Sequence, residues 1–262
     1  MALARLLLLA SAAILVPLDL PAQPFSDLYR AETIVTGNEE PERTRGLRII
    51  LADVVMKLTG DAGLAEDPKL EALLADPHAL LADIEYEDRM KGIPTHDEQG
   101  TRERPHFLRA RFDKAAMNAA LTDLGLALWD RPRPTIEVRL DVRTPAAAYV
   151  VASEGPDGYG QRMALTDTAA RRGLPIALPE SDTTVAFDEV AAIVDDATPV
   201  QGLDTPTLHG VLDLSSDSAY WDVDWRMIAK GRDEAWSQDG VTFDKAIRTG
   251  LTGAASILSG EA

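Results

Sequence analysis

One charged loop holds the residues whose types best suit acid-base chemistry. Between two predicted strands, residues 89 to 104 place His96 beside Asp97 and Glu98, with Arg102 and Arg104 close behind. A histidine next to carboxylates can exchange protons near neutral pH, because its unperturbed pKa is about 6.5. Spacing within a loop does not define geometry, and a solvated charged loop is the simpler interpretation. If the loop functions, recognition of a partner is favoured over chemistry.

Tryptophans form the second candidate site. In the segment from Tyr220 to Trp225, strand alternation places Trp221 and Trp225 on one face and the two aspartates on the other. An exposed tryptophan face binds peptides, glycans or proteins, whereas a covered one packs as core, here against a helix expected at Phe243–Leu258. Trp129 precedes a proline-rich connector that predicts either a docking segment or a rigid entry to the next strand.

Other catalytic and metal-binding patterns are missing from the sequence. It contains no cysteine, which excludes disulfides and thiolate chemistry, and no two of its four histidines have helical metal-ligand spacing. A nucleophile elbow, a phosphate loop and an EF-hand are also absent. We therefore assign no catalytic residue, no metal and no cofactor.

The first residues predict a cleaved secretory leader. Arg5 precedes an apolar run from Leu6 to Val16, and small residues at Leu20-Pro21-Ala22 suggest cleavage near Ala22. The run is too short to span a bilayer, and no later stretch is long and apolar enough to do so. We expect a periplasmic protein with no membrane span after cleavage.

Composition narrows the possible partners. The formal net charge of -17 disfavours binding to phosphate backbones, so no nucleic-acid partner is expected. A chain with 45% hydrophobic residues is large enough for one large or two modest cores without disulfides. An envelope protein is a possible partner, and the oligomeric state stays open.

Hydrophobic periodicity predicts an α/β (α+β) fold of two mixed-sheet subdomains, at residues 23–131 and 132–262 after a leader at residues 1–22. The alternation at His106–Asp113 places Phe107 on the opposite face from Leu108, Ala110 and Phe112. Helices are expected at Glu40–Met56, Pro68–Leu81 with a break at Asp76-Pro77, Lys114–Leu124, Tyr159–Arg172, Phe187–Val194 and Phe243–Leu258. Strands are expected at Leu28–Gly37, Asp83–Arg89, His106–Asp113, Ile136–Val142, Tyr149–Ala152 and Leu174–Leu178, and an antiparallel meander at Leu208–Leu214, Tyr220–Ile228 and Glu234–Gln238.

Six segments together resemble an uncharacterised bacterial envelope family of alphaproteobacterial type, domain of unknown function 2066. They are Glu42–Leu64, Asp88–Asp113, Leu124–Leu140, Arg171–Glu180, Trp221–Trp225 and Gly240–Gly260. The resemblance implies an exported, envelope-associated α/β protein and brings no activity or catalytic residues.

We therefore expect a non-enzymatic cell-envelope binding or assembly factor. The alternative is an envelope hydrolase or transferase that uses the His96 loop, which requires His96 to face a concave pocket near a carboxylate. A binding module requires instead an exposed apolar patch. A purely structural subunit is a third possibility and requires a stable homo-oligomer.

Overall fold

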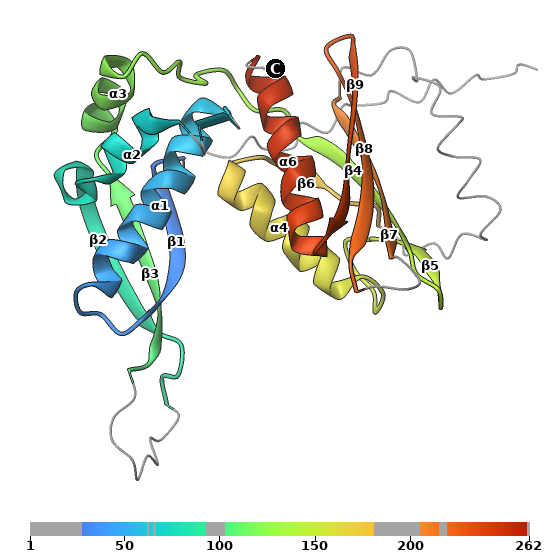
Figure 1. The fold of residues 1–262 in the computed structure, drawn as a ribbon, viewed down its shortest axis with the longest axis horizontal. Helices are drawn as coiled ribbons and strands as arrows, with labels where there is room; N and C mark the ends of the chain where they lie inside the picture. Colours follow the sequence, from blue (N-terminus) through green and yellow to red (C-terminus); the bar gives the residue numbers. More distant parts are fainter. Residues whose placement is uncertain are drawn as a thin grey trace, which may run out of the picture.

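A computed structural model describes residues 28–61, 63–64, 67–92, 103–180, 205–214 and 219–260 (Figure 1). It confirms the α+β fold class, with two separate sheets, packed helices and a C-terminal helix. The helix predicted at Phe187–Val194 lies outside the described residues, and so does the segment between the first two strands of the predicted meander, residues 215–218.

The first sheet has three antiparallel strands in the order β1-β3-β2. One face of it is covered by α1 (Glu42–Thr59), whose apolar stripe includes Leu47 and Ile50, both fully buried. The opposite face alternates to polar residues, as expected for an antiparallel sheet with one open face. The strands are β1 (Arg30–Thr36), β2 (Leu81–Asp88) and β3 (Pro105–Phe112).

Short helices complete this first half, and side chains cap two of them. The carboxylate of Asp67 accepts the backbone N–H of Lys69, and that of Asp113 accepts the backbone N–H of Ala116. Such N-caps satisfy backbone donors that a helix leaves unpaired. The predicted break at Asp76-Pro77 separates the first two helices. They are α2 (Pro68–Leu74), the 3-10 helix η3 (Pro77–Leu80) and α3 (Lys114–Asp123).

The second sheet is mixed, with the order β5-β4-β7-β8-β9 and with β6 also pairing with β4. Strands β4 and β7 are parallel, while β7, β8 and β9 form the expected antiparallel meander. Lys230 and Gly231, both at positive φ, make the tight turn between the last two strands. The strands are β4 (Ile136–Arg143), β5 (Ala148–Val150), β6 (Ile176–Ala177), β7 (Thr207–Leu214), β8 (Trp221–Ala229) and β9 (Arg232–Val241).

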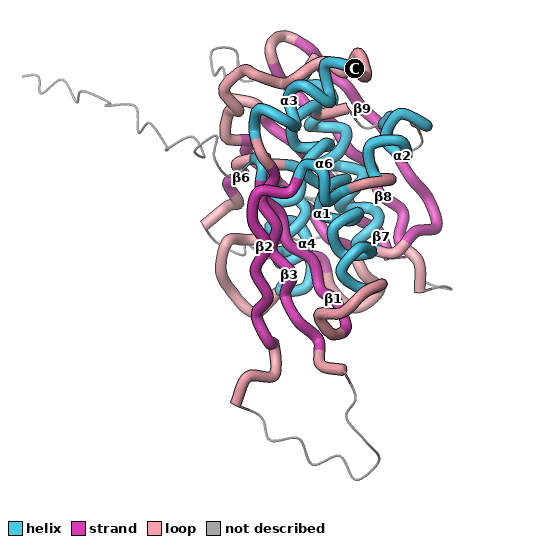
Figure 2. The backbone as a smooth tube through the Cα atoms, turned by 90° about the vertical axis from the view of Figure 1, so that its left-hand side faces the viewer, coloured by secondary structure: helices cyan, strands magenta, loops and turns pink. Residues whose placement is uncertain are grey.

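Two long helices lie between the sheets. The helix α4 (Tyr159–Arg172) packs beside α6 (Phe243–Ser259), and α6 covers the meander. Figure 2 shows β1, β2 and β3 in front of α1, α4 and α6, with the second sheet behind them. The helices of the two halves therefore face each other, and the first sheet turns its open face outward.

Buried apolar side chains form two clusters, one for each sheet. The first contains α1 and the three-stranded sheet, and the second contains α4, α6 and the mixed sheet. Trp129 packs in the second cluster, although it precedes the predicted boundary at residue 131. The connector that follows Trp129 thus begins where the chain already contacts the second core.

Candidate binding surface

Of the predicted charged loop, the structure describes residues 89–92 and 103–104, which form its base. His96, Asp97, Glu98 and Arg102 lie outside the described residues. Arg104 lies at the base, where its guanidinium donates to Asp88 Oδ2 at 3.1 Å and to the Met90 carbonyl at 3.2 Å. These contacts join the two chain segments that lead into and out of the loop.

The carboxylate of Asp88 is the centre of this loop base. Its Oδ1 accepts the Met90 N–H at 2.7 Å, and this bond, followed by the Arg104 contact, lowers the pKa of the Asp88 carboxyl. On either side, Arg89 N–H donates to the Pro105 carbonyl and Gly37 N–H donates to the Arg104 carbonyl. The strand ends are therefore fixed up to the point where the loop leaves the sheet.

An apolar patch lies beside this base, on the open face of the first sheet. Ile34 is 44% exposed and lies directly opposite Phe107 in the register of β1 and β3. Two guanidinium groups lie near the Phe107 ring, that of Arg89 at 4.9 Å and that of Arg109 at 5.5 Å from its centroid. We call Ile34, Phe107 and Arg89 the Phe107 patch. The alternation that places Phe107 off the core face was the sequence signal for it.

The rest of the open face is a ladder of ion pairs. Arg109 bonds Glu32 at 2.8 Å and Glu87 at 2.6 Å, and the other pairs are Arg30–Glu85 and Arg111–Asp83. The carboxylate side chains of these pairs are all more than half exposed, so each pair adds little stability. The ladder holds three arginines and four carboxylates, each in contact with a group of opposite charge, and the apolar end of the face is the Phe107 patch.

The candidate tryptophans lie mainly inside the protein. Trp225 is 2% exposed, and its indole N–H donates to the Ala246 carbonyl of α6 at 3.1 Å. Trp129 is 5% exposed and lies under the guanidinium of Arg133, while Trp221 is half-buried against the second core. The buried indoles of Trp129 and Trp225 leave little surface for a ligand.

A buried carboxylate on the outer face of the second sheet forms a site that sequence analysis missed. Asp141, whose side chain is 2% exposed, lies 2.5 Å from His209 Nε2 and accepts two hydrogen bonds from Arg139. Burial alone raises the pKa of the Asp141 carboxyl, but the hydrogen bonds from His209 and Arg139 outweigh it, so the pKa lies below its usual range. Asp141 and His209 are 68 positions apart and meet only because β4 pairs with β7.

Asp141→Asn is expected to lower the free energy of unfolding at pH 7 by about 1 to 2 kcal/mol, because His209 and Arg139 lose a charged acceptor. Since the folded-state pKa of Asp141 is depressed, its contribution is present above the unfolded pKa and is lost as pH falls through the folded one. Urea titrations at a series of pH values should show the difference between the variant and the parent shrinking below about pH 4. A difference that does not change with pH contradicts this assignment. Asp213→Asn, at an exposed ion pair on the same sheet, is the control.

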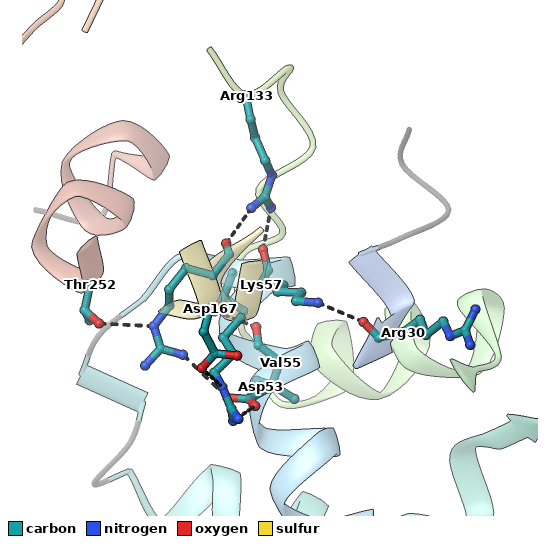
Figure 3. Close-up of polar contacts among 10 residues, drawn as sticks. Arg30, Asp53, Val55, Lys57, Arg133, Asp167 and Thr252 are labelled. Carbon is teal, nitrogen blue, oxygen red and sulfur yellow. Dashed lines mark hydrogen bonds and ion pairs between the residues drawn. The ribbon is translucent and has the colours of Figure 1, made fainter. Parts of the chain in front are cut away.

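A polar cluster joins the two helix layers (Figure 3). Asp53 of α1 accepts from Arg171 of α4 at 2.9 Å and lies 3.7 Å from Arg172, which in turn donates to Thr252 of α6. Burial raises the pKa of the Asp53 carboxyl more than the neighbouring arginines and Lys57 lower it. The contact between α1 and α4 is therefore an ion-pair interface, unlike the apolar cores on either side.

Arg133 ties the ends of the same two helices together. Its guanidinium donates to the Lys57 carbonyl of α1, and to the Arg172 and Gly173 carbonyls at the end of α4 at 3.1 and 3.2 Å. The cation thus lies at two helix C-termini, where the helix dipoles favour positive charge. Burial lowers the pKa of Arg133 to about 10, which leaves it charged at neutral pH. Its position in the short connector gave no sign of this role.

Among the residues that the structure describes, no group of three or more metal-ligating side chains is close enough to hold an ion. In the same ranges, no helix is both long and apolar enough to cross a membrane.

Comparison with known proteins corrects the family resemblance. The family model that matches is "Domain of unknown function (DUF8605)", over residues 22–130, and not domain of unknown function 2066. The segments behind the earlier resemblance are patterns of amphipathic helices and alternating strands, which unrelated α+β families share. The match covers less than half of the chain, in the part that holds the first sheet, and the family has no assigned activity.

Matches outside that family say little. No curated protein matches the chain. A solved structure described as "Crystal structure of uncharacterized protein" aligns with 49% of this chain and 91% of its own, at 11% identity and a TM-score of 0.26. Likeness at that level says nothing about the fold or function of this chain. What the comparisons support is similarity of residues 22–130 to a domain of unknown function.

Proposed function

We propose that this protein is an exported, non-enzymatic binding or assembly factor of the cell envelope, and that it recognises a protein partner through the Phe107 patch. The observation that carries the proposal is an exposed aliphatic side chain opposite an aromatic ring that two guanidinium groups approach, on an open sheet face. Aromatic residues and arginine are the residue types most enriched at the energetic centres of protein interfaces.

Export is supported by the leader pattern at the start of the chain. An apolar run of signal-peptide length ends in small residues near Ala22, and the match to the family model begins at residue 22. The absence of cysteine is compatible with an oxidising compartment, because no thiol is present to form unwanted disulfides.

The chemistry of the patch specifies its occupant. Every carboxylate of the ion-pair ladder already contacts an arginine, whereas the Arg89 guanidinium stacks on Phe107 and makes no ion pair with any described residue. A complementary partner offers an apolar side chain to Ile34 and Phe107 and a carboxylate to Arg89. We therefore infer a protein segment in which acidic residues flank an apolar one.

Site-specific photocrosslinking in intact cells tests this proposal. A photoreactive phenylalanine analogue replaces Ile34 in the full chain, and a matched protein carries it at Glu85, an exposed position nearer the other end of the same sheet face. We expect one dominant adduct in the envelope fraction from position 34 and not from position 85. The Arg89→Glu change should reduce that adduct at least tenfold.

Three outcomes contradict the proposal. They are equal adducts from positions 34 and 85, an adduct unaffected by Arg89→Glu, and recovery of the chain in the cytoplasmic fraction. In a parallel sample, His96→Ala with Asp97→Ala shows whether the loop belongs to the same surface, because loss of the adduct there extends the surface into the loop.

A further inference from the structure

A small hollow lies where the connector between the two halves leaves the first core, and we call it the Tyr29 pocket. Its volume is about 310 Å³, and its walls come from the residues before β1, the last turn of α1, the helix α3 and residues 128–130. Figure 1 shows the connector running from α3 to the second half. A hollow of this volume is at the lower end of the usual range for ligand pockets, so its occupant is a small molecule. The apolar and aromatic residues that line it are Leu28, Tyr29, Leu58, Leu128 and Trp129.

Two polar side chains of α3 also line the pocket. Lys114 and Asn118 are four positions apart, so they lie on the same side of the helix. The Lys114 ammonium lies 5.8 Å from the centroid of the Tyr29 ring, and it makes no ion pair with any residue that the structure describes. The Tyr29 hydroxyl donates to Asn118 Oδ1 at 2.8 Å, whereas Nδ2 of Asn118 donates to no described residue. The helix therefore brings to the pocket a cation and an amide donor, each able to bind an anionic group.

A carboxylate lines the same pocket from the connector. The N–H of Trp129 donates to the Leu58 carbonyl of α1 at 2.7 Å, and the N–H of Asp130 donates to the Leu128 carbonyl at 3.0 Å. These bonds fix the backbone of the connector against the end of α1. The Asp130 carboxylate pairs neither with Lys114 nor with any other cation in the described part of the chain. Within that part, the pocket thus carries one unpaired charge of each sign.

The chemistry of these groups specifies the ligand. A carboxylate on the ligand pairs with the Lys114 ammonium and accepts from Asn118 Nδ2, and an ammonium pairs with Asp130. The hydrocarbon part of the ligand contacts the leucines and the Tyr29 ring, where a polar group would lose its water without gaining a partner. We propose that the Tyr29 pocket binds a small zwitterion with an apolar body, of the kind represented by a free amino acid with an aliphatic or aromatic side chain.

Isothermal titration calorimetry of the purified protein with three compounds of similar shape tests the need for both charges. L-Phenylalanine carries both, phenethylamine lacks the carboxylate, and 3-phenylpropionate lacks the ammonium. We expect saturable binding of phenylalanine at one site for each chain. The other two compounds should bind at least tenfold more weakly, because each leaves one charged group of the pocket without its partner. L-Leucine should bind as well, and glycine, which has no apolar body, should bind at least tenfold more weakly than leucine.

Charge variants locate the site. Lys114→Gln should weaken phenylalanine binding at least tenfold and remove most of the preference for phenylalanine over phenethylamine. Asp130→Asn should in the same way remove most of the preference over 3-phenylpropionate. Lys69→Gln on α2 and Asp123→Asn at the end of α3 make the same changes in net charge outside the pocket, so they should leave phenylalanine binding within twofold. All four side chains are exposed, and circular dichroism checks that each variant is folded.

Three results overturn the proposal. They are the absence of saturable binding of both phenylalanine and leucine, equal binding of the three phenyl compounds, and equal effects of Lys114→Gln and Lys69→Gln. The variants leave the Phe107 patch intact, so the outcome is independent of the photocrosslinking result.

Discussion

Replacing Arg133 with leucine is expected to lower the free energy of unfolding by about 3 kcal/mol, because carbonyl groups at the ends of two helices lose their donor. The three carbonyls belong to Lys57, Arg172 and Gly173. Arg133, whose guanidinium donates to all three, is buried, with 8% of its surface exposed. Leucine also removes the cation that stacks on Trp129 at 3.9 Å. Urea unfolding followed by tryptophan fluorescence measures the loss.

Two further variants separate charge from geometry at this position. Arg133→Lys keeps the cation but has a single ammonium group, which cannot span the carbonyls of both helices as the planar guanidinium does, so most of the loss should remain. Arg111→Ala, an exposed arginine on the first sheet, should change the free energy of unfolding by less than about 0.5 kcal/mol. A lysine variant as stable as the parent would show that charge at the helix ends, and not the bridge, is what stabilises the protein.

Gly250→Ala should destabilise the protein by about 3 kcal/mol, although alanine is normally the better helix former. A Cβ atom at this position of α6 would lie 2.3 Å from Trp225 Cε2, and Gly210 also lies against the Trp225 ring, because a Cβ there would lie 2.4 Å from Cζ3. The buried ring has no room to move, so either the indole or the helix must shift.

A second helical glycine provides the matched control. At Gly160 of α4 an added Cβ meets Phe243 at 3.8 Å, an ordinary contact. Gly160→Ala should therefore stabilise the protein, by up to about 1 kcal/mol, because alanine loses less backbone entropy in a helix. Thermal unfolding of the two variants should show shifts of opposite sign. If both raise the melting temperature, the close packing of Trp225 against α6 is wrong.

Local patterns in the sequence predict most of the elements, because each depends on neighbouring residues. The capping role of Asp113, the end of α4 at Gly173 and the alternation around Phe107 all act within a few positions of the chain. The meander and the packing of Trp225 under α6 follow from strand alternation and one amphipathic helix. Burial of Trp225 is therefore predictable without knowing how the two halves meet.

Long-range pairings are what local patterns cannot supply. The parallel pairing of β4 with β7 brings Asp141 to His209, and the approach of α1 to α4 brings Asp53 to Arg171. In the sequence, an aspartate or arginine at those positions cannot be distinguished from a charged residue on the solvent-exposed surface. The contacts of Arg133 with the ends of α1 and α4 depend on the same approach of the two halves, which explains why the sequence indicated the loop and the tryptophans instead.

The place of β4 in the second sheet has a consequence for the order in which the protein folds. Every strand and helix of the first core lies before residue 124, so that core is complete as soon as this part of the chain is available. Strand β4 instead pairs with β7, about 70 positions further along the chain. Closing so long a segment is slow compared with forming hairpins between neighbouring strands. The meander and α6 can assemble from consecutive segments, so we expect docking of β4 onto the edge of β7 to be the late step that completes the second sheet.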